Sequence, residues 1–289
     1  MRFDKNKLTL GYGLSCIENY ILFLLMQYDS EWKYIFYKSY LSFSQIFDEF
    51  YINKTRYSYF YGIPRLQEVG KELKKLDVNI FTTKSIESLF QQSRIAAICV
   101  TPEYIEEKYK TKLWRTDHFI LVQKQEDGRY TYINDTPQDS GLLSFDELNR
   151  MFTGSSILIK LENTSITDDN RVEMLQFFYE TVLHAKNSDS GKVFDGEIEI
   201  DMLRDIIGVL RVVVKRTAAF CNMYCDVVFL HEYYDYIDNV YAKLEYMRIR
   251  NRYTSGELCE IVNKINIKDN IIRSLLIERI ENIYEDSKR

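Results

Sequence analysis

The spacing of apolar positions changes along the chain, from a mixture of short and long periods in the first half to helical spacing in the second. Runs with a period near 3.6 residues alternate in the first half with short β-branched or aromatic runs. This pattern predicts, in order, a helix from 16, a helix from 64, strands at 77–81 and 94–101 around a helix at 85–92, a hairpin at 118–135, a helix at 144–152 and a strand at 156–161. The polar segment at 162–170 indicates a domain boundary.

From residue 171 onward the spacing is helical almost without interruption. We expect four helices, at about 171–186, 198–220, 222–252 and 256–285, with one substantial loop between the first two. The sequence therefore predicts an α+β protein with a mixed domain over 1–165 and a helical domain over 166–289. The helical domain would act as a lid or as a docking surface, and a purely stabilising bundle is the alternative.

Cys16 stands at the predicted start of the first helix. Ser15, followed three residues later by Glu18, has the pattern of a capping box, which puts Cys16 at the first helical position. There the helix dipole favours a thiolate, and the backbone N–H can donate to a developing oxyanion. Glu18 acts in the opposite direction, because a carboxylate in the first turn disfavours the thiolate. The pattern predicts a nucleophile; a cysteine that merely falls near a cap is the alternative.

Few side chains can serve as the base for such a nucleophile, because the histidines are only His118, His184 and His231. His118 opens a β-branched and aromatic run, and Asp127-Gly128 separates it from a second such run, which is a hairpin pattern. His184 is flanked by apolar residues and fits an ordinary helix position.

The hairpin also predicts the partner of His118. With Asp127 and Gly128 as a two-residue turn, Asp135 lies opposite Ile120 and diagonal to His118, whereas Asn134 falls on the other face. The sequence therefore predicts a triad of Cys16, His118 and Asp135 for nucleophilic acyl transfer. The alternative is a hairpin whose polar residues only flank its turn.

The capped helix at Cys16, the strand at 115–122 and the segment 132–137 together resemble the papain-like, C39-peptidase-like cysteine fold, and within it the acyltransferases of the butirosin biosynthesis protein H type. The resemblance covers roughly residues 1–165. It implies a papain-like fold, with an N-terminal nucleophile helix and an antiparallel sheet, followed by a helical appendage. It also implies an enzyme of nonribosomal biosynthesis that takes an acyl group from the phosphopantetheine thioester of a carrier protein and passes it to an amine, forming an amide. A cysteine peptidase of the same fold and a non-catalytic peptide- or carrier-binding protein are the alternatives.

The oxyanion hole departs from the family pattern. Papain-like enzymes carry a glutamine several residues before the cysteine, and the stretch 7–15 has none. The N–H of Cys16 would be one donor, and Thr9, Tyr12 or a backbone N–H of the glycine turn would supply the second.

A net charge of −5 argues against general nucleic-acid binding but leaves room for local basic patches. One basic patch comes shortly before His118, and we expect it to dock an acidic carrier protein, with a merely solvated face as the alternative. Its members are Lys108, Lys110, Lys112 and Arg115.

We expect no metal and no bound cofactor, because Cys221 and Cys225, one helical turn apart, cannot close a tetrahedral shell by themselves. Five scattered cysteines argue against a disulfide framework. The first residues lack the apolar segment of a signal peptide, and no apolar run is long enough for a bilayer. A cytoplasmic protein without membrane contact is therefore expected.

Overall fold

The chain forms two compact units. The computed structural model describes all residues except 1, 2, 4, 5, 7, 9, 84, 111–117, 163, 189–192, 288 and 289. The first unit contains Met1–Trp32 and Leu66–Thr164, and the second contains Lys33–Arg65 and Ser165–Arg289. The boundary at 164 lies next to the predicted one, but Lys33–Arg65 joins the helical unit, whereas the sequence pattern assigned it to the mixed domain.

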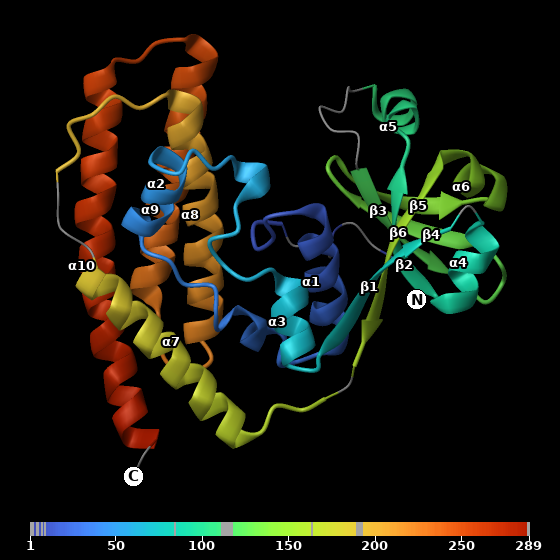
Figure 1. Cartoon of the computed structure of the whole chain (residues 1–289), viewed down its shortest axis with the longest axis horizontal. Coiled ribbons are helices and arrows are strands. Elements are labelled where there is room, and N and C mark those ends of the chain that lie inside the picture. The colour runs from blue at the N-terminus through green and yellow to red at the C-terminus, as the bar shows by residue number, and fades with distance from the viewer. Residues whose placement is uncertain are drawn as a thin grey trace. The chain divides into compact units, whose positions relative to one another are not determined.

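A six-stranded antiparallel sheet is the centre of the first unit (Figure 1), and its strand order is β1-β6-β2-β3-β4-β5. The strands are β1 (Leu76–Thr82), β2 (Ile95–Val100), β3 (His118–Lys124), β4 (Tyr130–Asp135), β5 (Gln138–Leu143) and β6 (Phe152–Leu161). The predicted α+β class is confirmed. Strand β5 was not predicted, because its mostly polar residues lack the alternation of a half-buried strand.

Helices cover both faces of this sheet (Figure 1). They are α1 (Cys16–Tyr28), α3 (Leu66–Glu72), α4 (Ile86–Gln92), α5 (Pro102–Tyr109) and α6 (Phe145–Met151). On one face, apolar side chains of β2, β3 and β4 form a buried cluster with α4, α5 and α6, whose members include Ile98, Ile120 and Tyr132. On the other face, α1 contacts β3, β4 and β6. Every residue of α1 from Tyr20 to Leu25 is buried, so this helix belongs to the core.

The β3–β4 hairpin has a register one residue away from the predicted one. Leu121 pairs with Ile133, and the Gln125 N–H donates to the Arg129 carbonyl at 2.8 Å, which closes a three-residue loop. Gly128, the third loop residue, has φ +81°, the left-handed conformation that loops of this length use there. The predicted two-residue turn is therefore wrong, and a shift of one residue moves each side chain of β4 to the opposite face.

The second unit is helical. Its elements are the 3₁₀ helices η2 (Trp32–Phe36) and η3 (Tyr57–Tyr59) and the α-helices α2 (Phe43–Tyr51), α7 (Asp168–Ser188), α8 (Ile200–Cys221), α9 (Val228–Arg250) and α10 (Ser255–Ser287). The four long helices confirm the predicted ones, except that α9 begins six residues later than residue 222. No helix in the part of the chain that the structure describes is long and apolar enough to cross a membrane.

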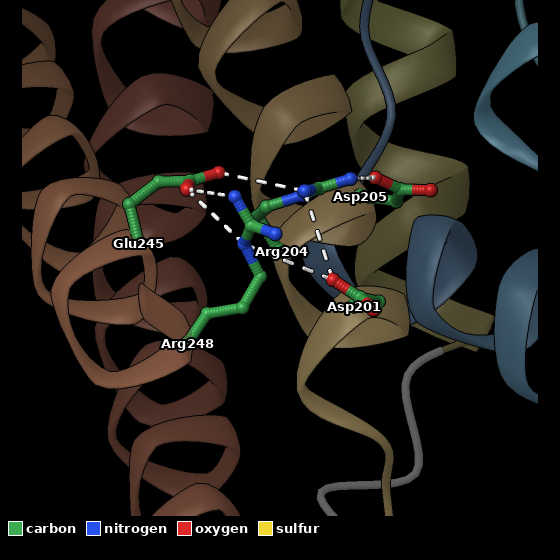
Figure 2. A network of polar contacts seen from close by, with 5 residues as sticks. All are labelled: Asp201, Arg204, Asp205, Glu245 and Arg248. Atoms are coloured by element: carbon green, nitrogen blue, oxygen red, sulfur yellow. Dashed lines mark hydrogen bonds and ion pairs between the residues drawn. The ribbon is translucent and has the colours of Figure 1, made fainter. Parts of the chain in front are cut away.

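An ion-pair network joins α8 to α9 (Figure 2). Arg204 of α8 lies 3.5 Å from Glu245 of α9 and 2.9 Å from Asp205, and Arg248 of α9 lies 2.9 Å from Glu245 and 3.9 Å from Asp201. These side chains are between a quarter and two thirds exposed, so each pair adds only a fraction of a kcal/mol to stability.

A buried carboxylate joins α10 to α2 and α9. Asp269 accepts hydrogen bonds from the Phe43 N–H at the start of α2, at 3.1 Å, and from the Tyr233 hydroxyl of α9, at 2.9 Å. Replacing Asp269 by Ala leaves both donors without this acceptor, and we expect a loss of about 3 kcal/mol in the free energy of unfolding. Urea unfolding measures this loss. Glu260→Ala on the exposed side of α10 is the matched control, and an equal effect of the two substitutions would contradict the assignment.

Candidate functional site

The imidazole of His118, the first residue of β3, is held by an asparagine of the neighbouring strand. His118 Nε2 lies 2.6 Å from Asn134 Oδ1, and Asn134 is fully buried. Asn134 Nδ2 donates to the Pro137 carbonyl at 3.0 Å, and because a carbonyl only accepts, this bond turns Oδ1 toward His118. Oδ1 also only accepts, so Nε2 carries the proton. In the neutral form of a ring held in this way, Nδ1 is the nitrogen that can accept a proton.

Within the described residues, the side-chain hydrogen bonds of Asp135 go to α1, and none joins it to His118, its predicted partner. Its Oδ2 accepts from Asn19 Nδ2 of α1 at 3.0 Å, and its Oδ1 lies 3.4 Å from the Tyr20 hydroxyl. The three-residue loop explains the difference, because the shifted register points Asp135 toward α1 and Asn134 toward His118. In the structure, Asn134 rather than Asp135 is therefore the hydrogen-bond partner of the His118 ring.

The Tyr20 hydroxyl fills a gap between β3 and β4. The pairs of this ladder end with Leu121 and Ile133, and continuing the register would pair Phe119 with Asp135. The hydroxyl lies between the two, donating to the Phe119 carbonyl at 2.7 Å and accepting from the Asp135 N–H at 3.3 Å. Burial raises the pKa of Tyr20 well above its usual value, and the Asp135 carboxyl and the Cys16 thiol raise it further. The phenol therefore stays protonated and keeps this bridge.

Cys16 is the first residue of α1, as the capping pattern predicts. Ser15 is the N-cap, and its hydroxyl accepts from the Glu18 N–H at 3.3 Å. The second half of the box differs from the prediction, because the Glu18 carboxylate accepts from the Leu14 N–H at 2.7 Å and from the Leu66 N–H at 3.0 Å. Leu66 begins α3, so Glu18 joins the starts of two helices, and its charge is stabilised by two backbone dipoles.

One face of α1 carries Cys16, Asn19 and Tyr20, because residues three and four apart are neighbours on a helix. Asn19 and Tyr20 hold this face against the ends of β3 and β4. Cys16 is partly exposed one turn before Tyr20, where the helix N–H groups have no acceptor within the helix. The structure therefore places Asn19 and Tyr20 against the end of the hairpin that carries His118 and Asn134, with Cys16 one helical turn earlier.

The loop before Cys16 folds closely over the first turn of α1. A Cβ atom at Gly13 would lie 2.3 Å from Asn19 Oδ1 and 2.9 Å from the Asn19 nitrogen, so only glycine fits without a shift. The glycine therefore helps to place the thiol.

Thr9 and Tyr12 are the side chains predicted as second oxyanion donors. Thr9 lies outside the described residues. The Tyr12 ring packs edge-on against Trp32, with 5.8 Å between the ring centroids. The role of either residue as a donor stays a prediction.

Of the predicted carrier-docking patch, the structure describes Lys108 and Lys110. Lys112 and Arg115 lie outside the described residues, and Lys110 is exposed at the end of α5 with φ 55°. Lys108 uses its charge within its own unit: its ammonium is hydrogen-bonded to the Tyr132 hydroxyl and lies 3.4 Å from the Asp139 carboxylate. The role of Lys108 in carrier docking stays a prediction.

Three aromatic rings surround the same ammonium. The ring centroids of Tyr132, Tyr109 and Tyr104 lie 4.0, 5.4 and 5.5 Å from Lys108 Nζ. The hydroxyls of Tyr109 and Tyr132 donate to Asp139 Oδ2 at 2.9 and 2.5 Å. We call Tyr104, Tyr109, Tyr132 and Asp139 the tyrosine cage. No sequence pattern indicates this cage, because its members are distributed over α5, β4 and β5.

Within the described residues, no three His, Cys, Asp or Glu side chains come together as metal ligands would. No protein-family model matches the sequence, and neither the curated proteins nor the solved structures contain a significant match. The geometry of the site and the chemistry of its residues are therefore the basis for assigning a function.

Removing the Tyr20 hydroxyl tests the bridge between α1 and the hairpin. Tyr20→Phe leaves the Phe119 carbonyl and the Asp135 N–H without this partner, so we expect the free energy of unfolding to fall by about 1–2 kcal/mol. Urea unfolding followed by circular dichroism measures the change. The control is Tyr28→Phe at the half-exposed end of the same helix, for which we expect a smaller loss. Equal losses would contradict the bridge.

The tyrosine cage predicts a pH dependence of stability. Burial acts to raise the pKa of Asp139, but hydrogen bonds from Tyr132 and Tyr109 and the Lys108 charge lower it overall. A lowered carboxyl pKa stabilises the fold above the unfolded value, near 4, and this contribution is lost as the pH falls through the folded pKa. Wild type should therefore be more stable than Asp139→Asn at pH 7, with a difference that shrinks below about pH 4. Denaturant unfolding between pH 3 and pH 7 measures this difference in the free energy of unfolding. Glu106→Gln, at an exposed position of α5, is the control. A difference between wild type and Asp139→Asn that grows toward acid pH would contradict the prediction.

Proposed function

We propose that this protein is a cysteine-dependent acyltransferase of papain-like architecture, in which Cys16 is the nucleophile, His118 the base and Asn134 the residue that orients the base. The observation that carries the proposal is the His118–Asn134 pair, which fixes the imidazole in the tautomer of a base at the hairpin end that α1 contacts. The order of a thiol-bearing helix followed by an antiparallel sheet also supports it.

The proposed reaction has two half-reactions. The Cys16 sulfur attacks the carbonyl of a carrier-bound thioester; a new C–S bond forms, the old one breaks, and the thiol proton passes through His118 to the departing pantetheine sulfur. The backbone N–H of Cys16, at the helix N-terminus, donates to the oxyanion. An amine then attacks the acyl-enzyme; a C–N bond forms, the C–S bond to Cys16 breaks, and the amine proton passes through His118 to the departing Cys16 sulfur. The sum is an amide and a free thiol, with no oxidant or reductant.

The thioester donor and the amine acceptor are what the family resemblance of the sequence implies. The capped helix start supports Cys16 as the nucleophile, and the contact with Asn134 supports His118 as the base. A hydrolase would share the first half-reaction and use water in the second. A binding protein would catalyse neither half-reaction. The two half-reactions are therefore tested separately.

Intact-mass spectrometry after incubation with a short-chain acyl-pantetheine thioester tests the first half-reaction. We expect one acyl adduct on the wild type and none on Cys16→Ser, whereas Cys259→Ser, at another partly exposed thiol, should keep it. Asn134→Ala should slow adduct formation by about a hundredfold, because a base that is no longer oriented seldom reaches the reactive geometry. Asp135→Asn keeps an acceptor for Asn19 and should slow it much less.

The outcomes separate the three readings. Failure to form any adduct would favour the binding protein, and an adduct at a cysteine other than Cys16 would overturn the assigned nucleophile. A larger loss for Asp135→Asn than for Asn134→Ala would restore the predicted triad. Addition of an amine to the isolated acyl-enzyme then distinguishes a transferase, which gives an amide, from a hydrolase, which gives only the free acid.

A further inference from the structure

The tyrosine cage lies on the same face of the sheet as the His118–Asn134 pair. Asp139 of β5 pairs with Asn134 of β4 in the ladder, and Asn134 in turn contacts His118. The Tyr109 hydroxyl, which donates to Asp139, is also close enough to Asn134 to interact with it. A single residue therefore separates the base from the cage.

The chemistry of the cage is that of a site for an organic cation. Tyrosine hydroxyl oxygens accept hydrogen bonds from an ammonium, as those of Tyr132 and Tyr104 do from Lys108. The electron-rich rings add attraction, and a carboxylate adds a full opposite charge. The Tyr109 and Tyr132 hydroxyls both donate to Asp139 Oδ2, so they hold the carboxylate in place without help from Lys108. The cage can therefore stay assembled when its cation is exchanged.

The position of Lys108 allows its side chain to move out of the tyrosine cage. It lies in the last turn of α5, and its side chain and that of Asp139 are 28% and 27% exposed. Its ammonium is held by the Tyr132 and Tyr104 hydroxyls and by Asp139, and the four-carbon stem of a lysine can rotate away from these partners. The same features make Lys108 an internal competitor for any external ammonium.

We infer that the tyrosine cage binds the primary-ammonium end of a linear alkylamine and that Lys108 fills the cage when no amine is bound. An ammonium in the cage is protonated and cannot attack an acyl group, so the cage anchors a molecule whose second nucleophilic group reaches His118. This role in catalysis rests on the proposed function. The binding itself does not.

Calorimetric titration with pentylammonium chloride tests the inference, with the neutral isostere pentanol as the matched probe. All proteins carry Cys16→Ser, so that no acyl transfer occurs. Replacement of Lys108 by Met keeps the stem and removes the competing charge, and we expect it to tighten pentylammonium binding about tenfold, while pentanol gains nothing. Adding Asp139→Asn to Lys108→Met should reverse the gain. Glu106→Gln, exposed on the same helix, should leave binding unchanged.

Equal affinities with and without Lys108, or equal affinities for pentylammonium and pentanol, would overturn the inference. If Lys108→Met does not fold in buffer, pentylammonium but not pentanol should restore soluble protein on refolding, and equal yields in the two would overturn it as well. The two proposals can fail separately. If the protein with its native Cys16 thiol is not acylated, the proposed function fails, and amine binding is unaffected. If the cage does not bind an amine, this inference fails, and acylation of Cys16 is unaffected.

Discussion

The arrangement of the candidate site depends on one buried hydroxyl. The Tyr20 phenol lies where β3 and β4 stop pairing and takes the place of a ladder hydrogen bond between Phe119 and Asp135. Buried backbone groups need partners, so two strands can separate at this end only because a side chain of α1 supplies them. The same contact fixes α1 against the hairpin. The position of Cys16, one turn earlier on that helix, follows from it.

The hairpin register gives the adjacent residues Asn134 and Asp135 different partners. Successive side chains of a strand point to opposite faces, so Asp135 supports α1 while Asn134 orients His118. The Asp135 carboxylate accepts from Asn19 of α1, and the Asn134 amide, whose Oδ1 contacts His118, is fixed by the Pro137 carbonyl. Neither residue can exchange roles with the other, because a one-residue slip of β4 would also move Tyr132 out of the apolar cluster on its face.

Local patterns predicted much of this structure, and non-local contacts account for the rest. Apolar periodicity located the long helices and five of the six strands, and the Ser15 cap placed Cys16 correctly. The register was wrong because Asp127-Gly128 fits both a two-residue turn and the end of a three-residue loop, and sequence alone does not choose between them. The Tyr20 bridge had no local signal. The membership of Lys33–Arg65 in the helical unit is likewise set by packing between distant segments.

For the basic residues before His118, the spacing of charges in the sequence does not predict what each charge contacts in the fold. By spacing alone, Lys108 belongs to a solvated patch, and its sequence neighbours say nothing of Tyr132 or Asp139. In the fold, its ammonium contacts the Tyr132 side chain of β4 and the Asp139 carboxylate of β5. Because the Tyr109 and Tyr132 hydroxyls hold Asp139 independently of Lys108, the recognition chemistry belongs to the cage rather than to the lysine. A site that is complete without its resident cation is suited to exchange that cation for another.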